Sequence, residues 1–140
     1  MLISACLLGV ACRYDGSGQI LPALDALMAR YELIPVCPEQ LGGLPTPRPP
    51  AEIQGDRVIN REGIDVTAQY KKGAEEAARL YQLLRCDCAV LKARSPSCGC
   101  GEIYDGSFSG ALISGNGITA QALNRLGIRV LTEETLGSLS

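Results

Sequence analysis

The sequence predicts a three-layer α/β fold, in which helices cover both faces of a mainly parallel sheet of about four to five strands. Short apolar runs alternate along the chain with segments of helical periodicity, a pattern typical of parallel strands joined by helices. The 140 residues fit one domain, since domains commonly hold about 100–200 residues. No internal repeat divides the chain. We therefore expect a single domain over residues 1–140.

The first third of the chain contains two predicted strands with a helix between them. Leu2–Leu7 and Leu33–Val36 are short apolar runs, as expected for buried strands. The stretch Leu41–Pro50 holds too many glycines and prolines for a helix or a central strand, so we expect a loop there. The helix is predicted over Pro22–Tyr31, with Pro22 suited to its first turn and with apolar residues at helical spacing, namely Leu24, Leu27 and Met28.

The middle of the chain predicts one long helix. We place it over Val66–Arg85, with Asp65 as its N-terminal cap. A small strand or hairpin arm, Gly55–Asn60, precedes it. The apolar residues expected along the buried side of the helix are Ala74, Ala77, Ala78, Tyr81 and Leu84.

The last third of the chain predicts two further strands. Cys88–Lys92 and Ile128–Leu131 are again short apolar runs. A helix over Thr119–Leu126 precedes the second of these and ends at Gly127, because glycine is the usual residue just past a helix end. The segment Tyr104–Gly117 is rich in turn-forming residues, and we expect no regular element there.

Composition excludes several classes of function. The formal net charge of −2 gives no electrostatic support for binding nucleic acid or a membrane surface. The chain has no histidine, so it can build neither a Ser-His-Asp nor a Cys-His catalytic couple, nor a metal site with imidazole ligands. No apolar run approaches the roughly 18 residues of a membrane-spanning helix, and no secretory leader is evident. We therefore expect a cytoplasmic protein whose thiols stay reduced.

Three of the seven cysteines follow predicted strands. Cys6 lies at the carboxyl end of the first strand, Cys37 at the carboxyl end of the second, and Cys98 in the loop after the third. In open parallel sheets, ligand sites form outside the carboxyl ends of the strands, where the strand order changes direction. The three thiols could therefore converge on one crevice.

The other four cysteines divide into two pairs. Cys86 and Cys88 lie at the amino end of the third strand, and their separation of two residues places both on one face of the sheet, so we expect core residues. Cys12 and Cys100 each lie a few residues beyond a candidate ligand, and either could replace that ligand or pack beside it. The spacing of Cys98 and Cys100 is too tight for the usual redox pair or a zinc knuckle.

Three thiolates from separate loops fit an iron–sulfur cluster better than structural zinc, which takes a closed set of four ligands, commonly from paired knuckles. A cubane cluster held by three cysteines leaves one iron without a protein ligand. That iron could bind a substrate as a Lewis acid, or accept a soft ligand such as sulfur.

Polar residues beside the cysteines offer acid–base chemistry. Glu39 would point into the same crevice, where a carboxylate suits proton transfer, although a loop or capping role explains it equally well. Ser95 and Ser97 could donate to a substrate oxygen or position water, or simply form a turn. Gly115–Gly117 could bind an anion but lacks the dinucleotide fingerprint, so no nucleotide cofactor is expected. Four cations could offset the charge of a cluster, but each alone is expected on the solvated surface: Arg13, Arg48, Lys92 and Arg94.

Three cysteine-containing blocks resemble those of a small bacterial family that contains the thiouracil desulfidase TudS. The resemblance extends over essentially the whole chain, and the three blocks together are far more specific than a lone pair of cysteines. The blocks are Ser4–Gly9 with Cys12–Gly16, Val36–Glu39 with Leu41–Leu44 and Thr46–Arg48, and Leu91–Lys92 with Ser95–Gly99.

The resemblance implies a Rossmann-like domain with a 4Fe–4S cluster on Cys6, Cys37 and Cys98 and one iron without a protein ligand. It also implies an enzyme, a desulfidase that hydrolyses the thiocarbonyl of a thiolated uracil without redox chemistry and releases uracil and hydrosulfide. Glu39 and Ser95 match the catalytic residues proposed for the family. The partner would be a small thiolated pyrimidine, and neither nucleic acid nor a membrane is expected.

Other hypotheses stay open. A cluster-binding sulfur-carrier or sensor module would hold sulfide without turnover. A catalyst that uses Cys98 as a persulfide nucleophile would be active without metal. Cys12 and Cys100 likewise stay open as alternative ligands in place of Cys6 and Cys98.

Overall fold

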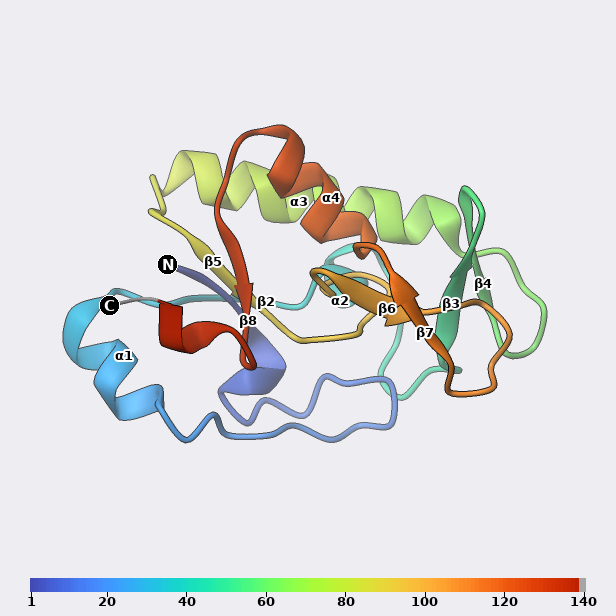
Figure 1. Cartoon of the computed structure of the whole chain (residues 1–140), viewed down its shortest axis with the longest axis horizontal. Helices are drawn as coiled ribbons and strands as arrows, with labels where there is room; N and C mark the ends of the chain where they lie inside the picture. The colour runs from blue at the N-terminus through green and yellow to red at the C-terminus, as the bar shows by residue number, and fades with distance from the viewer. Residues whose placement is uncertain (139–140) are drawn as a thin grey trace.

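The computed structural model describes residues 1–138 and centres on a four-stranded parallel sheet. The order across the sheet is β2 (Ile34–Val36), β1 (Leu2–Ser4), β5 (Ala89–Leu91) and β8 (Val130–Thr132). The chain adds β2 on one side of β1 and then crosses to add β5 on the other side (Figure 1). The predicted α/β class and parallel sheet are confirmed, and each of these strands lies within or beside a predicted one.

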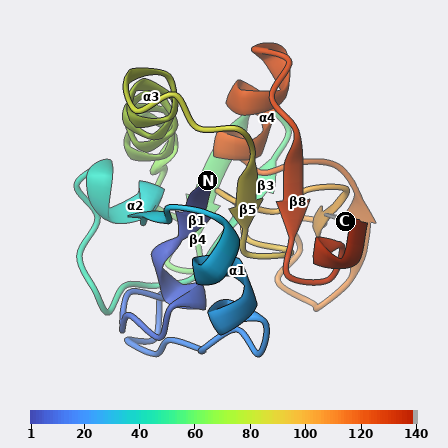
Figure 2. The same ribbon diagram turned by 90° about the vertical axis from the view of Figure 1, so that its left-hand side faces the viewer.

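Helices cover both faces of the sheet, as predicted (Figure 2). On one face lie α1 (Leu24–Arg30) and a terminal 3₁₀ helix, η2 (Leu136–Ser138). On the other face lie α3 (Thr67–Leu83) and α4 (Ile118–Arg125). Successive strand residues point to opposite faces, so the sheet contributes to two separate apolar clusters, one containing Ile3 and Val90 and the other Leu2 and Leu91.

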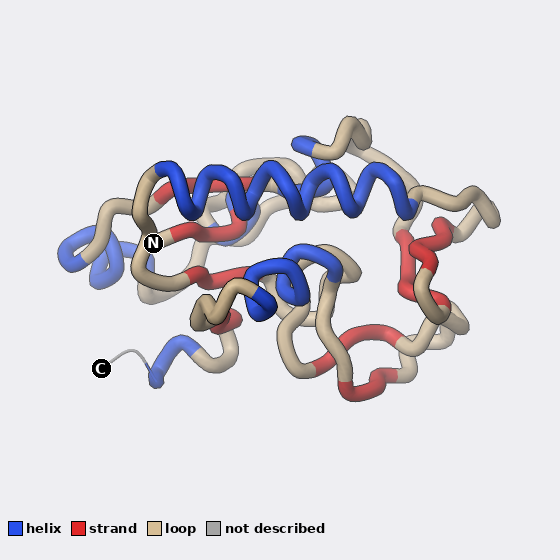
Figure 3. The backbone as a smooth tube through the Cα atoms, turned by 90° about the horizontal axis from the view of Figure 1, so that it is seen from above, coloured by secondary structure: helices blue, strands red, loops and turns tan. Residues whose placement is uncertain are grey.

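The longest helix, α3, begins at Thr67 and ends at Leu83, slightly inside the predicted bounds. The N-cap residue is Val66 and not Asp65 as predicted, but the Asp65 carboxylate still accepts a hydrogen bond from the Thr67 N–H at 2.9 Å, which satisfies one of the free amides of the first turn. Leu84 is exposed rather than buried, because the helix has ended there and Arg85 turns the chain away with a φ of 53°. Figure 3 shows α3 extending from beside the β3–β4 hairpin, described below, along the central sheet. Its buried residues include Tyr70, Ala74, Ala77 and Tyr81.

The structure differs from the prediction in two places at the carboxyl end of the sheet. The first strand ends at Ser4, and Ala5–Leu7 form a 3₁₀ turn (η1) where the prediction continued the strand. A short helix, α2 (Pro38–Leu41), follows β2 where no helix is predicted. Pro38 occupies its first turn, where the missing N–H of proline costs no hydrogen bond. Both changes bend the chain just past a strand, which keeps the following residues near the edge of the sheet.

Two hairpins stand outside the central sheet, at the right in Figure 1. β3 (Ala51–Gln54) pairs with β4 (Arg57–Asn60), in agreement with the predicted hairpin arm. β6 (Glu102–Tyr104) pairs with β7 (Leu112–Ser114), where only turns are predicted. All of β7 is exposed, so this strand lacks the alternation of apolar and polar residues that marks a half-buried strand.

The cysteines at the start of β5 differ from the prediction. Cys88 is buried in the cluster on the α1 face, whereas Cys86 is half-buried against the cluster on the α3 and α4 face. Cys86 lies in the turn before β5, not in the strand, so the alternation of side chains along a strand does not apply to it. Both residues pack in the interior, but on opposite faces of the sheet.

The structure contains no membrane-spanning candidate within residues 1–138, because none of the helices there is both long and apolar enough to cross a bilayer.

Candidate active site

A cavity of about 490 Å³ opens at the carboxyl ends of the central strands. Ser4, Val36 and Lys92, which end or directly follow β1, β2 and β5, are among its lining residues. Because β1 has β2 on one side and β5 on the other, the strand order changes direction here, which is the usual place of ligand binding in an open α/β sheet. The volume falls in the range of about 300–1,000 Å³ that is typical of small-molecule sites.

The structure brings the five predicted site residues to this one cavity. Cys6 lies in η1, Cys37 lies between β2 and α2, and Cys98 lies in the loop after β5. All three line the cavity, and so do Glu39 and Ser95. Segments that are far apart in the sequence thus place thiols, a carboxylate and a hydroxyl around one space.

The structure separates the two ambiguous cysteines. Cys12 lines the cavity and is only 2% exposed, and the Cys37 thiol donates to its backbone carbonyl at 3.7 Å. Cys100 does not line the cavity. Its thiol donates to the carbonyl of Val130 at 3.7 Å, and its side chain packs against the cluster on the α3 and α4 face. Cys12 therefore stays beside the three candidate ligands, whereas Cys100 belongs to the packing of β8.

Burial dominates the thiol chemistry of the cavity. It raises the pKa of Cys6 to about 11 and the pKa of Cys98 to about 12, because a thiolate loses its hydration inside the protein. Burial and the neighbouring Cys37 raise the pKa of Cys12 to about 12. The Lys92 ammonium acts on Cys6 in the opposite direction. Thiols of this kind become thiolates at neutral pH when a metal replaces the proton.

The arrangement of donors fits an iron–sulfur cluster. Within residues 1–138, no three His, Cys, Asp or Glu side chains are grouped so as to hold a single metal ion. The three thiolates of a cubane cluster bind three different irons, so they lie further apart than the ligands of one tetrahedral zinc. Cys6, Cys37 and Cys98 bring soft thiol donors, the ligand type of iron–sulfur clusters, to one cavity from three separate segments.

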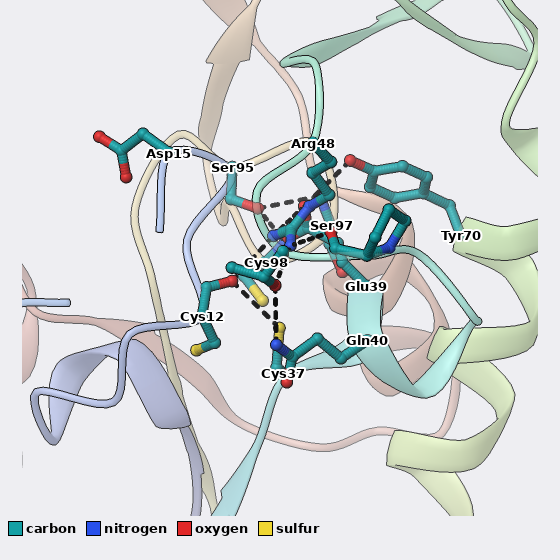
Figure 4. Close-up of polar contacts among 12 residues, drawn as sticks. Cys12, Asp15, Cys37, Glu39, Gln40, Arg48, Tyr70, Ser95, Ser97 and Cys98 are labelled. Carbon is teal, nitrogen blue, oxygen red and sulfur yellow. Dashed lines mark hydrogen bonds and ion pairs between the residues drawn. The ribbon is translucent and has the colours of Figure 1, made fainter. Parts of the chain in front are cut away.

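Glu39 is held at one of its two carboxylate oxygens. Arg48 Nη2 lies 2.9 Å from Glu39 Oε2, and Arg48 Nε donates to the same oxygen at 3.0 Å. The Tyr70 hydroxyl donates to it as well, at 3.1 Å. Figure 4 shows Arg48 and Tyr70 both directed at Glu39. The contact with Glu39 and burial raise the pKa of Tyr70 well above its ordinary value, burial being the larger cause, so Tyr70 is a neutral donor.

The sequence predicts Arg48 on the solvated surface, but the structure shows it buried. Its side chain is 4% exposed, and Nη2 also donates to the Cys12 carbonyl at 3.0 Å (Figure 4). Nη1 donates to the Pro45 carbonyl at 3.2 Å and to Thr46 Oγ1 at 3.0 Å. A guanidinium presents its donors in a fixed planar fork, so one residue can fix the carboxylate and the loops on either side of it.

Tyr70 is not among the site residues predicted from the sequence, although a signal for its burial is present. Tyr70, Ala74, Ala77 and Tyr81 follow the spacing of one helix face, so the buried side of α3 can be extended back to Tyr70. No comparable signal reveals the burial of Arg48, because it lies in a proline-rich loop without periodicity.

Ser95 organises the loop that carries Cys98. Its Oγ accepts hydrogen bonds from the backbone N–H groups of Ser97 and Cys98, both at 3.1 Å. Since the oxygen accepts two bonds, the hydroxyl proton is left to donate towards the cavity, which Ser95 lines. Ser97 has a different place. It is fully buried, and its hydroxyl pairs with that of Thr119 on α4 at 2.9 Å.

Gly115–Gly117 supports the Cys98 loop and is not a free anion site. The Gly117 N–H donates to the Gly99 carbonyl at 2.7 Å, and the Gly115 N–H to the Gly101 carbonyl at 3.1 Å. A Cβ atom at Gly117 would lie 2.4 Å from the backbone of Ser97, so only glycine allows this approach. The amides that an anion would use are engaged within the protein.

Two of the other predicted cations, Lys92 and Arg94, are paired with carboxylates. Lys92 Nζ lies 2.7 Å from Glu133 Oε2, and both side chains are largely shielded from solvent. Arg94 Nη2 contacts both carboxylate oxygens of Glu134, at 2.8 and 2.7 Å, and its side chain is partly exposed. Lys92, Arg94 and Arg13 all line the cavity, and of these Lys92 and Arg13 favour the thiolate form of Cys6.

The outer wall of the cavity comes from the two hairpins. Glu52 on β3 is buried, and its Oε1 accepts from the N–H groups of Gly106 and Phe108, at 3.0 and 3.1 Å, in the loop between β6 and β7. Arg61 lies over the Phe108 ring at 5.5 Å, in a cation–π contact. Glu52, Arg61 and Phe108 line the cavity at this end.

Comparison with known proteins identifies the family of the chain. The model of the 2-thiouracil desulfurase family matches residues 1–135. The chain belongs to this family. The predicted resemblance to the family of TudS is thereby confirmed.

Two relatives of this desulfurase-family chain match it over almost its whole length. A solved structure described as the [4Fe-4S]-dependent thiouracil desulfidase TudS is 48% identical, with a TM-score of 0.94, and the match covers 99% of this chain and 93% of that one. The uncharacterised protein YbbK of Bacillus subtilis (strain 168) is 38% identical over 149 aligned positions, which cover 99% of each chain. This chain and the TudS structure therefore share the whole fold, including the segments that line the cavity.

Proposed function

We propose that this chain is a desulfidase that removes sulfur from a thiolated uracil by hydrolysis, with a 4Fe–4S cluster held by Cys6, Cys37 and Cys98. The family membership and the likeness to TudS support the substrate and the cofactor. The observation that carries the proposal is the single cavity lined by these three thiols together with Glu39 and Ser95.

The three thiolates would hold three irons and leave the fourth without a protein ligand. When bound, the cluster supplies a Lewis acid that polarises the carbon–sulfur bond and receives the departing sulfur. The cations around the thiols, Lys92 and Arg13 among them, favour the negative charge of this assembly.

Glu39 is the proton acceptor in this proposal. Among the contacts within residues 1–138, those of Arg48 and Tyr70 with Glu39 fall on Oε2. Oε1 is therefore the oxygen that takes a proton from water. Arg48 and Tyr70 fix the direction in which Oε1 points, and positioning of this kind favours the geometry for proton transfer.

Ser95 orients the reacting groups. Because its oxygen is occupied by the N–H groups of Ser97 and Cys98, its proton donates into the cavity, to the attacking water or to the developing oxygen on the ring. The water oxygen bonds to the thiocarbonyl carbon, one water proton goes to Glu39, and the carbon–sulfur bond breaks as the sulfur leaves with the bonding electron pair. The second water proton and then the proton held by Glu39 pass to the sulfur, which completes hydrogen sulfide. The sum is thiouracil plus water giving uracil plus hydrogen sulfide, with no net transfer of electrons.

Anaerobic reconstitution tests the proposal. We expect about four irons and four sulfides per chain, and release of hydrosulfide from 2-thiouracil or 4-thiouracil by the loaded protein. A loaded protein that releases no sulfur from either compound contradicts the substrate, and turnover by protein stripped of iron points instead to a cysteine persulfide on Cys98.

Two sets of variants test the residue roles. The iron content should fall in each variant of a proposed ligand, namely Cys6→Ser, Cys37→Ser and Cys98→Ser, and should not fall in Cys100→Ser. If Cys12→Ser loses iron while Cys6→Ser loads fully, Cys12 and not Cys6 is the first ligand.

Glu39→Gln should keep the cluster and lose turnover, and Glu102→Gln, at an exposed residue of β6, is its control. If Glu39→Gln exchanges sulfide as the wild type does and the wild type shows no turnover, the chain is a sulfur carrier and not a desulfidase.

A further inference from the structure

Ser4 is a buried polar residue at the end of an otherwise apolar strand. β1 consists of Leu2, Ile3 and Ser4, and Ser4 is 2% exposed. A hydroxyl buried among apolar residues costs free energy unless it is hydrogen-bonded. The partners of this hydroxyl therefore show what it does at the carboxyl end of the sheet.

The Ser4 hydroxyl links the neighbouring strand to a cysteine. Its Oγ accepts a hydrogen bond from the backbone N–H of Lys92 at 2.9 Å, and it donates to Cys98 Sγ at 3.4 Å. Lys92 directly follows β5, the strand paired with β1. Because the lone pairs of Oγ face the Lys92 N–H, the hydroxyl proton is directed at the sulfur.

Cys98 has few other ways to stabilise negative charge. Its side chain is 3% exposed and packs in the apolar cluster with Leu2, Val36 and Leu91. A thiolate in such surroundings is unfavourable without hydrogen bonds or a cation. Of the contacts that offset the burial of Cys98, the one from Ser4 is the largest.

We propose that Ser4 is a positioning residue for the iron–sulfur cluster, donating a hydrogen bond to the Cys98 sulfur while that sulfur is bound to iron. This inference rests on the proposed function, in which Cys98 is a ligand. Hydrogen bonds to ligand sulfurs draw electron density from the cluster and set its reduction potential. The same withdrawal makes the iron a stronger Lewis acid, and the bond holds the third ligand in place.

The test compares the substrate-free, reconstituted wild type with Ser4→Ala and Ser4→Thr. Ser4→Ala removes the donor, and Ser4→Thr keeps a hydroxyl at the same position. Thr67→Val is the matched control, because the Thr67 hydroxyl is also buried and also accepts a backbone N–H, that of Val58 at 2.8 Å, but faces no cysteine. The readouts are the midpoint potential of the cluster and the rate of iron release to a chelator.

We expect Ser4→Ala to have a lower potential than the wild type and to release iron about tenfold faster, as expected for the loss of a hydrogen bond to a charged group. Ser4→Thr and Thr67→Val should stay close to the wild type in both. Unchanged potential and release rate in Ser4→Ala overturn the inference.

Loss of the cluster is informative as well. Failure of Ser4→Ala to hold a cluster that Ser4→Thr retains supports the role of the hydroxyl. Equal loss of the cluster in Ser4→Ala and Ser4→Thr assigns the effect to packing and overturns the inference. The readouts need no substrate, so a loaded wild type that fails to desulfurise thiouracil contradicts the proposed function and leaves the role of Ser4 to be decided by the potentials.

Discussion

Replacing Arg48 with methionine should strongly destabilise the protein. The Arg48 and Glu39 side chains are 4% and 13% exposed, so their ion pair is shielded from water. Removing one partner of a buried pair leaves an uncompensated charge and costs about 3–5 kcal/mol. Arg48→Met also strips hydrogen-bond donors from the Cys12 and Pro45 carbonyls. A small domain has a total stability of about 5–15 kcal/mol, so the loss is a large fraction of it.

Urea unfolding of the reduced protein under anaerobic conditions measures this effect. The midpoint should fall sharply in Arg48→Met, while the slope of the transition, which reports the surface exposed on unfolding, stays constant. The double variant Arg48→Met/Glu39→Gln removes both charges, so it should lose less than the sum of the two single variants.

The matched control is Arg57→Met. Arg57 and Asp65 form an ion pair at 3.4 Å, but the side chains are 62% and 46% exposed, and such surface pairs are worth at most about 1 kcal/mol. If Arg48→Met loses no more free energy of unfolding than Arg57→Met, the stabilising role of the buried Arg48–Glu39 pair is refuted. Strict additivity of the two single losses in Arg48→Met/Glu39→Gln would refute it as well.

Three further predictions concern the cavity. Tyr70→Phe removes one hydrogen-bond donor from Glu39, so kcat should fall about tenfold with KM little changed. Tyr81 is buried on the same helix, and Tyr81→Phe should leave kcat unchanged. An equal loss of kcat in both variants would assign the effect to packing. Gly117→Ala places a Cβ 2.4 Å from the backbone before Cys98, so melting temperature and bound iron should both fall, whereas Gly137→Ala, with open space around it, should match the wild type. In the iron-free protein, burial raises the pKa of Cys98 from 9.0 to about 12. The stability that comes from keeping this thiol neutral is complete below pH 9 and is lost as the pH rises towards 12. The melting temperature should therefore decline less above pH 9 in Cys98→Ser than in the wild type.

The convergence of the cysteines could be predicted because it depends on topology alone. Apolar periodicity locates the strands, and parallel strands place their carboxyl ends at one edge of the sheet. Cys6, Cys37 and Cys98 each follow such an end, so no knowledge of side-chain conformation is needed to bring them together.

Residues that support the site could not be predicted in the same way. Arg48 is buried because Glu39 and the Cys12 carbonyl lie within its reach, and those partners come from other segments of the chain. Ser4 stands in an apolar run whose burial is predictable, but the partner of its hydroxyl, Cys98, is 94 residues away. Such pairings are properties of the tertiary structure, not of a local pattern.

The β6–β7 hairpin escapes prediction for a different reason. Its strands have three residues each, and β7 is exposed throughout. Strands of three residues are too short to show a period, so the segment reads as turns, and it is defined by the pairing of the two strands and by contacts with Glu52 and Gln54.

The contacts between Glu52 and the β6–β7 loop hold together the outer wall of the cavity. This wall contains Arg61 and Phe108, and it rests on hairpins outside the central sheet whose strand ends are followed by Cys6 and Cys37. Substitutions of Arg61 or Phe108 therefore change the space offered to a ligand, while the residues that carry the thiols stay the same.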